Sequence, residues 1–213
     1  MSVEKEISYT ATNTYSTLNT LTPKTKNVWM VCHGLGYLSR YFIAYFNHLN
    51  AEENYIIAPQ APSKYYQGTD FKHVGASWLT KENTAKETHN IVSYIDAVYK
   101  NEAIPETCNL IVMGYSQGVS VAMRWVAKQK INCDKLLIHS GGIPKELTAE
   151  DFQFATNTNV FHIFGAKDQY ITEERIAYEK ERALELFGNN VVTKPFDGGH
   201  VVNTRFLTEI ALL

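Results

Sequence analysis

The chain has no long hydrophobic run. None of its apolar stretches approaches the roughly 18 consecutive residues that a membrane-spanning helix needs, so we expect no membrane span. Residues 1–6 lack the apolar segment of a secretory signal. Repeats, low-complexity tracts and linkers are absent too. With 213 residues, of which 45% are hydrophobic, the chain is expected to form a single domain over residues 1–213.

A strong charge of either sign is also missing. The 20 lysines and arginines nearly balance the 22 aspartates and glutamates, which leaves a net charge of −2. Nucleic-acid-binding proteins concentrate positive charge, so we expect no nucleic-acid partner. A near-neutral chain also has no overall field that would steer an anionic substrate towards it.

Cysteine is scarce. Cys32, Cys108 and Cys133 are odd in number, and their spacing does not fit a metal site. We expect reduced and mostly buried thiols, which are typical of a cytoplasmic protein. Cys32 lies in an apolar stretch and is predicted to be a core residue rather than a nucleophile.

The most informative motif that is present is Gly-Tyr-Ser-Gln-Gly at residues 114–118, which fits G-x-S-x-G. A predicted strand at 110–113 precedes it and a predicted helix at 119–128 follows it. A serine at such a sharp turn is strained and exposes its hydroxyl, and a Cβ at either glycine would collide with the crossing strand or helix. We therefore predict that Ser116 is a nucleophile. The alternative is a glycine-rich turn with an ordinary N-cap serine.

Strands and helices alternate along the rest of the chain. Residues 7–18 are predicted to form an edge strand or hairpin, and residues 61–77 a long irregular loop. Further strands are predicted at 28–32, 55–58, 136–139, 160–164 and 191–196, and further helices at 38–49, 80–100, 173–187 and 201–213. This order predicts an α/β fold whose mostly parallel sheet is covered by helices on both faces.

A serine nucleophile needs an adjacent base. Sites in parallel sheets form at the carboxyl ends of the strands. Among the seven histidines, His200 follows two glycines in a loop after the last predicted strand, and we predict that it is the general base. His139 ends a strand at the same edge and is the alternative, although packing or a loop hydrogen bond is the simpler expectation. His162 lies inside an apolar strand and is expected to be a satisfied core histidine.

The imidazole needs a carboxylate to hold its tautomer. Asp168 lies just past a predicted strand, and the order Ser116, Asp168, His200 is that of an α/β-hydrolase. Asp197 is the alternative. It stands only three residues before His200, where a turn-forming role is natural.

The oxyanion of an acyl-transfer intermediate needs N–H donors. The amide of Gln117, at the start of a helix, is one candidate. The amide of Leu35, in the loop His-Gly-Leu-Gly at residues 33–36, is the other, and a plain strand-ending turn is the alternative for this loop. The ring of His33 is expected to brace the loop rather than to transfer protons.

Taken together, residues 33–36, residues 114–118, Asp168 and Gly199-His200 resemble the phospholipase/carboxylesterase family of α/β-hydrolases, which includes acyl-protein thioesterases. The resemblance covers nearly the whole chain. It implies an α/β-hydrolase fold without a large cap, hydrolysis of a small ester or thioester substrate without a cofactor or metal, and the same triad and oxyanion donors. Two departures are visible: Val119 replaces a common second glycine, and residues 78–80 only partly match Trp-Phe-Asp.

An apolar acyl site is expected around these loops. Its candidate lining residues, besides Leu35, are Tyr37, Trp78, Ile143, Tyr170, Ile171 and Val201. The segment at 61–77 is the only obvious one that could cover such a site, and a core or surface loop without a substrate role is the alternative for it. Three functions stay open: a serine esterase or thioesterase that forms an acyl-enzyme, another α/β-hydrolase chemistry such as a lyase or acyltransferase, and a catalytically silent binding protein. A strained serine argues against the third, since binding alone does not need one.

Overall fold

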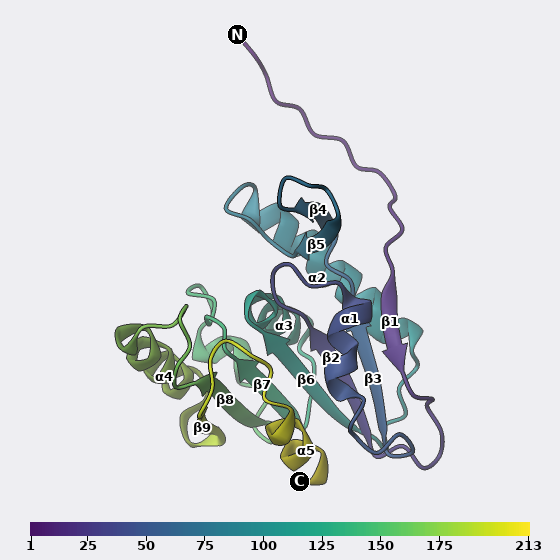
Figure 1. The fold of residues 1–213 in the computed structure, drawn as a ribbon, viewed down its shortest axis with the longest axis vertical. Helices are drawn as coiled ribbons and strands as arrows, with labels where there is room; N and C mark the ends of the chain where they lie inside the picture. Colours follow the sequence, from purple (N-terminus) through teal and green to yellow (C-terminus); the bar gives the residue numbers. More distant parts are fainter.

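A seven-stranded sheet forms the centre of the computed structural model, which describes residues 1–213. Its strands are β1 (Tyr15–Leu18), β2 (Asn27–Cys32), β3 (Asn54–Pro59), β6 (Asn109–Tyr115), β7 (Lys135–His139), β8 (Asn159–Gly165) and β9 (Val191–Phe196). They lie in the order β1-β3-β2-β6-β7-β8-β9, as Figure 1 shows, and only β1 is antiparallel to its neighbour. The predicted mostly parallel sheet is confirmed, with an edge strand at its start.

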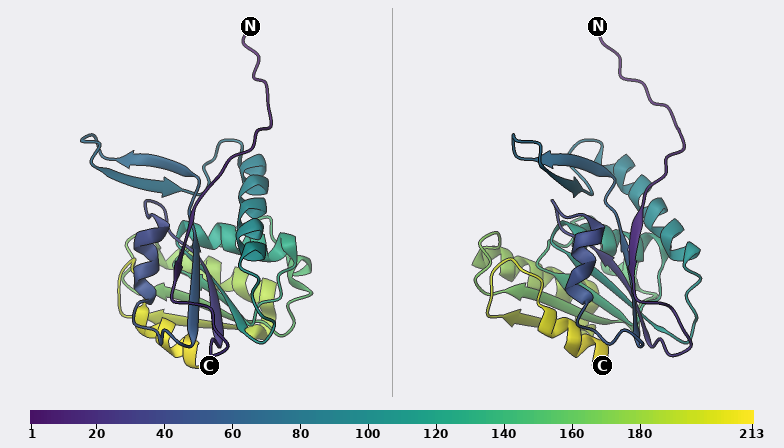
Figure 2. Two further views of the ribbon diagram at one scale, coloured as in Figure 1. Left: turned by 90° about the vertical axis from the view of Figure 1, so that its right-hand side faces the viewer. Right: turned by 45° about the vertical axis from the view of Figure 1, so that its right-hand side comes forward.

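Helices cover both faces of this sheet (Figures 1 and 2). One layer contains α2 (Thr84–Asn101), α3 (Gln117–Gln129) and α4 (Glu173–Phe187), and their buried side chains belong to one apolar cluster. The other layer contains α1 (Ser39–Phe42), the 3-10 helix η1 (Ile43–Phe46) and α5 (Thr204–Leu212), which share a second cluster. Two further 3-10 helices, η2 (Ala149–Phe152) and η3 (Gly188–Asn190), lie in connections.

Strand β2 shows how the two layers are built. Val28, Met30 and Cys32 pack into the first layer, whereas Trp29 and Val31 pack into the second. All five side chains are completely buried because helices cover both faces of a parallel strand. The loops that follow the carboxyl ends of the strands therefore start from a fully packed sheet.

The prediction of an irregular loop at residues 61–77 is wrong. Strands β4 (Ser63–Gln67) and β5 (His73–Ser77) pair antiparallel as a hairpin that extends away from the main sheet (Figure 2). Every residue of β4 is exposed, so no apolar alternation marks it in the sequence.

Two other boundaries differ from the predictions. The helix predicted at 38–49 is shorter, because α1 and η1 divide the segment and end at Phe46. The strand predicted within 7–18 covers only β1, and the residues before it lie exposed without regular structure. No large cap is inserted between the core elements, and no helix combines the length and the hydrophobicity needed to cross a membrane.

Candidate active site

Ser116 occupies the sharp turn between β6 and α3. Its backbone has φ 53° and ψ −120°, a conformation that is strained for any residue with a Cβ. A Cβ on Gly114 would collide with the backbone of Val119, and one on Gly118 would collide with the carbonyl of Cys32. Both glycines are therefore needed for the strand and helix to approach each other closely around the serine.

A continuous hydrogen-bonded chain links the serine, a histidine and an aspartate. The Oγ of Ser116 lies 2.9 Å from Nε2 of His200, and Nδ1 of His200 lies 2.6 Å from Oδ2 of Asp168. Because a carboxylate only accepts hydrogen bonds, Nδ1 carries the proton and Nε2 is free to accept one from the serine. The Asp168 side chain is fully shielded from solvent, whereas 16% of the His200 side chain is exposed.

The loops that carry His200 and Asp168 are tied to each other. Ala166 N donates to the carbonyl of Phe196 and Lys167 N donates to that of Gly198, at 2.8 and 2.9 Å. The hydroxyl of Tyr115 donates to the carbonyl of His200 at 2.9 Å. These bonds fix the position of the imidazole relative to the carboxylate.

Asp197, the alternative carboxylate, forms no hydrogen bond or ion pair with His200. Its exposed side chain forms an ion pair with Lys167 at 2.6 Å. Asp168 is more firmly held, because its second oxygen accepts the N–H of Tyr170 at 2.9 Å. The geometry therefore favours Asp168 as the partner of His200.

The segments that carry the two candidate oxyanion donors both lie next to the serine. A Cβ on Gly34 would be 3.2 Å from the Cβ of Ser116, which places the 33–36 loop beside the nucleophile. The Leu35 N–H donates to no group of the protein. The Gln117 N–H belongs to the first residue of α3, where no carbonyl four residues earlier is in the helix. Both amides are thus available to a ligand.

The Gln117 side chain ties the start of α3 to the end of the hairpin. Its Oε1 accepts the N–H of Trp78, and its Nε2 donates to the carbonyl of Leu79, both at 2.8 Å. The hairpin also contacts the 33–36 loop, because Gly36 N donates to the carbonyl of Ala76 at 2.9 Å. Both donor-bearing segments are therefore anchored to the β4–β5 hairpin and its continuation.

His33 braces the loop from inside. Its Nε2 accepts the N–H of Ala61 at 3.1 Å, so Nδ1 carries the proton and donates to the carbonyl of Gly34 at 2.8 Å. Burial lowers the pKa of His33 to about 4. The ring is therefore neutral at pH 7, with both nitrogens occupied, as expected of a bracing residue.

His139, the alternative base, is likewise occupied. Its Nε2 accepts the N–H of Asn203 at 3.0 Å, and its Nδ1 donates to Ser140 Oγ at 3.0 Å. Burial, with a smaller contribution from His200, lowers the pKa of His139 to about 3. The ring joins the end of β7 to the start of α5, and no nitrogen is left to act on Ser116.

Cys32 and Cys133 are buried, and burial raises the pKa of each thiol to about 12. A thiol with so high a pKa is a poor nucleophile at neutral pH. Cys32 is a core residue, as predicted.

Buried neutral histidines should make the protein acid-sensitive. Burial lowers the pKa of His33 and His162 to about 4 and that of His139 to about 3. In the unfolded chain each titrates near 6.5, so below that pH the unfolded state binds more protons and the free energy of unfolding falls. Near pH 5.5 we expect a loss approaching 4 kcal/mol per pH unit. Urea unfolding between pH 7.5 and 5 measures this slope, and a flat profile would contradict it.

A cavity of about 290 Å³ opens beside Ser116 and His200, and only four of its 14 lining residues are hydrophobic. Of the residues predicted to line an apolar site, Tyr170 and Ile171 do so. Trp78 and Ile143 are instead buried in the core, Tyr37 bonds to the hydroxyl of Tyr45, and Val201 is exposed outside the cavity. Phe164 and Ile176 add further apolar surface to the lining, and the expected apolar acyl site stays a prediction.

The cavity also contains residues that sequence reasoning missed. Arg175 lines it from the first turn of α4, and Gly142 lines it from the loop after β7. His162 is a lining residue too, and its buried Nδ1 has no hydrogen-bond partner, so it is not the satisfied core histidine that was expected. In the sequence, the paired glycines at 141–142, which follow the predicted strand at 136–139, are the feature that could have indicated this part of the cavity.

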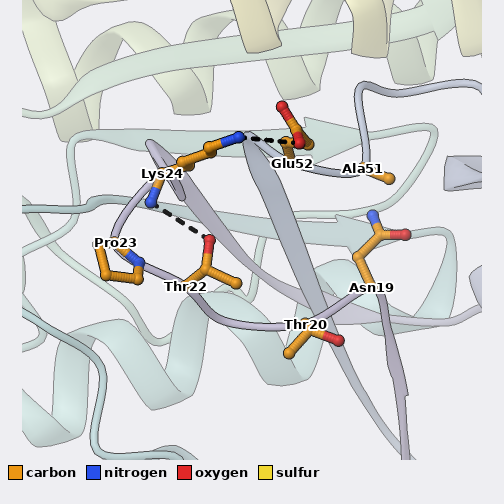
Figure 3. Close-up of a pocket in the computed structure, with 7 residues that line it drawn as sticks. All are labelled: Asn19, Thr20, Thr22, Pro23, Lys24, Ala51 and Glu52. Carbon is orange, nitrogen blue, oxygen red and sulfur yellow. Dashed lines mark hydrogen bonds and ion pairs between the residues drawn. The ribbon is translucent and has the colours of Figure 1, made fainter.

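A hollow of about 560 Å³ lies elsewhere, between the β1–β2 connection and the residues before β3 (Figure 3). It is at the amino edge of the parallel strands, whereas Ser116 follows the carboxyl end of β6. Its Lys24–Glu52 ion pair at 3.0 Å is largely exposed. No group with catalytic geometry lies there.

Comparisons with known proteins bear on the fold. Residues 14–212 match the family described as Phospholipase/Carboxylesterase. No curated protein is similar enough to the chain to count as a match. The crystal structure of Zea mays acyl-protein thioesterase 2 is 17% identical with a TM-score of 0.69, over 94% of this chain and 97% of that one. The crystal structure of esterase PE8 is 20% identical with a TM-score of 0.67, over 94% of this chain and 100% of that one. The crystal structure of the phospholipase/carboxylesterase from Dyadobacter fermentans DSM 18053 is 18% identical with a TM-score of 0.65, over 97% of this chain and 99% of that one. At these identities the likeness establishes the fold.

Proposed function

Because the chain belongs to the phospholipase/carboxylesterase family, we propose that it is a serine hydrolase that cleaves carboxylic esters or thioesters through an acyl-enzyme. The observation that carries this proposal is the hydrogen-bonded chain from Ser116 through His200 to Asp168, with links of 2.9 and 2.6 Å. The structurally similar proteins named above include an acyl-protein thioesterase and an esterase, which is consistent with this class of reaction.

In the first half of the cycle, Ser116 Oγ attacks the carbonyl carbon of the substrate while Nε2 of His200 takes the hydroxyl proton. The carboxylate of Asp168 stabilises the imidazolium through Nδ1. When the tetrahedral intermediate collapses, the bond from carbon to the ester oxygen or thioester sulfur breaks. Nε2 then returns its proton to that leaving atom, and the acyl group stays on Ser116.

In the second half, water takes the place of the leaving alcohol or thiol. Nε2 of His200 accepts a proton from the water, whose oxygen attacks the acyl carbon. Collapse breaks the bond to Ser116 Oγ, which recovers its proton from His200, and a carboxylic acid is released. Side chains of the protein, the substrate and one water account for every bond and proton.

The negative charge of each tetrahedral intermediate develops on the former carbonyl oxygen. We assign its stabilisation to the amides of Leu35 and Gln117, with help from the positive end of α3. Donors of this kind act without reorganising during the reaction, and losing one typically costs about 3–4 kcal/mol of transition-state stabilisation. Anchoring of both segments to the hairpin keeps the two amides in place.

A fluorophosphonate probe tests the proposal directly. Such probes phosphonylate an activated serine, so we expect one adduct on the folded protein, located at Ser116 by peptide mass spectrometry. Boiled protein is the control, because it keeps the serine and loses the geometry. Absence of labelling in folded protein would contradict a serine hydrolase. Labelled protein that cleaves no ester or thioester would instead point to a lyase or an acyltransferase.

A further inference from the structure

The cavity beside Ser116 combines apolar side chains with a small group of polar ones. Phe164, Tyr170, Ile171 and Ile176 supply the apolar surface. Arg175 and His162 line the same space, as do Ser120 and Ser140, whose hydroxyls are already hydrogen-bonded to Arg124 and His139. A purely hydrocarbon acyl chain would keep water from the unpaired groups of Arg175 and His162 without giving them partners, which is unfavourable.

Several N–H groups of Arg175 donate no hydrogen bond within the protein. Its Nε donates to Oε1 of Glu179 at 2.5 Å, and its guanidinium makes no other hydrogen bond within the protein. Glu179 is fully engaged, because its other oxygen accepts the N–H of Ile143 at 2.8 Å. The charge of Glu179 is thus compensated, and both Nη groups of Arg175 remain available. A planar pair of N–H donors matches the two oxygens of a carboxylate.

His162 provides a second, independent sign of a missing ligand. Only 3% of the residue is exposed, it lines the cavity, and its buried Nδ1 has no hydrogen-bond partner in the protein. Burial, together with the nearby charge of Lys180, lowers the pKa of His162, so the ring is neutral at pH 7 and has one N–H to donate. An unpaired buried polar group is destabilising, and a bound hydrogen-bond acceptor would remove that cost.

The glycines after β7 connect these polar groups to the nucleophile. A Cβ on Gly142 would lie 2.3 Å from Nη2 of Arg175, so the guanidinium packs directly against this glycine. A Cβ on Gly141 would collide with the carbonyl of Ser116. The same two-residue turn therefore packs against both the candidate nucleophile and the arginine.

We propose that this cavity selects esters or thioesters that carry a free carboxylate, which Arg175 binds and to which His162 donates. The inference rests on the proposed function, since it names the substrate class of the same site. The apolar side chains of the cavity then contact the short methylene segment between the carboxylate and the scissile carbonyl. The carboxylate belongs either to the acyl group, as in a monoester of a small dicarboxylic acid, or to the alcohol.

Matched substrates test this selection in the unmodified enzyme. Monoethyl glutarate and ethyl pentanoate have acyl chains of the same length and differ in the terminal carboxylate. A second pair, 4-acetoxybutanoate and butyl acetate, places the carboxylate on the alcohol. With hydrolysis followed by pH-stat, we expect kcat/KM to be at least about tenfold higher for the charged member of one pair, which identifies the side that carries the carboxylate. Equal or lower values for the charged member of both pairs would overturn the inference.

Substitutions identify the recognising residue. Arg175→Met should remove the advantage of the charged ester over the neutral one, mainly through KM. Arg175→Lys keeps the charge and the pairing with Glu179 but loses the planar fork, so it should retain part of the preference. Arg205→Met is the matched control, because Arg205 also has a glutamate four residues later but lies exposed on α5. A preference that survives Arg175→Met in folded protein would contradict the assignment.

Labelling of Ser116 separates this inference from the function on which it rests. Wild type and Arg175→Met should both react with a fluorophosphonate, which lacks the carboxylate. Labelling without any preference for the charged esters overturns the carboxylate site alone. Absence of labelling in the folded wild type overturns the serine-hydrolase proposal itself.

Discussion

Replacing Ser116 by alanine should abolish turnover, with kcat falling by about 10⁵–10⁶-fold. The hydroxyl is the only group of the site placed to form an acyl-enzyme, and His200 alone cannot supply that bond. Alanine keeps the backbone and removes one oxygen, so the melting temperature should change by only a few degrees. Initial rates on a p-nitrophenyl ester series, extended to thioesters, measure the effect.

Ser93→Ala is a suitable control, because Ser93 is an exposed serine on α2. It should retain the activity of the wild type. Turnover above about one per cent in Ser116→Ala, after contamination is excluded by labelling, would mean that water is activated directly or that another nucleophile acts.

The Asp168→Asn substitution should lower kcat by about 10⁴-fold, the size of effect expected when an imidazole loses its orienting carboxylate. The amide nitrogen of asparagine would donate to Nδ1 of His200, which would move the ring proton to Nε2. A protonated Nε2 cannot accept the hydroxyl proton of Ser116. The kcat values of folded protein, measured across pH, report this loss.

Asp197→Asn provides the matched comparison within the same loop pair. It removes an exposed ion pair with Lys167, and exposed pairs contribute about 0–1 kcal/mol to stability. Its activity should stay within about twofold of wild type. If Asp197→Asn proved more damaging than Asp168→Asn, the carboxylate assignment would be wrong.

The parts of the fold that were predictable from sequence are those whose burial leaves a local pattern. Strand β2 is a continuous apolar run because both of its faces are covered, and α4 ends at Phe187, just before Gly188, as predicted. The hairpin β4–β5 was missed because β4 is exposed on both faces. Its pairing is made by backbone hydrogen bonds, which leave no trace in the order of polar and apolar residues.

The amino-acid sequence by itself determined the candidate chemistry. Ser116, Asp168 and His200 each follow a strand, and parallel strands bring their carboxyl ends to one edge, so local patterns suffice to predict that the three would meet.

Only the tertiary structure decided which residues line the cavity beside Ser116. Trp78 and Ile143, which were predicted to line the site, are buried in the core. His162 Nδ1 is buried without a hydrogen-bond partner, and the guanidinium of Arg175 lies against Gly142. Cavity lining depends on how α4 packs against the loop after β7, two segments more than 30 residues apart. The periodicity of apolar residues indicates whether a side chain is buried. It does not indicate which residues, distant in the sequence, that side chain contacts, or whether its polar atoms find hydrogen-bond partners.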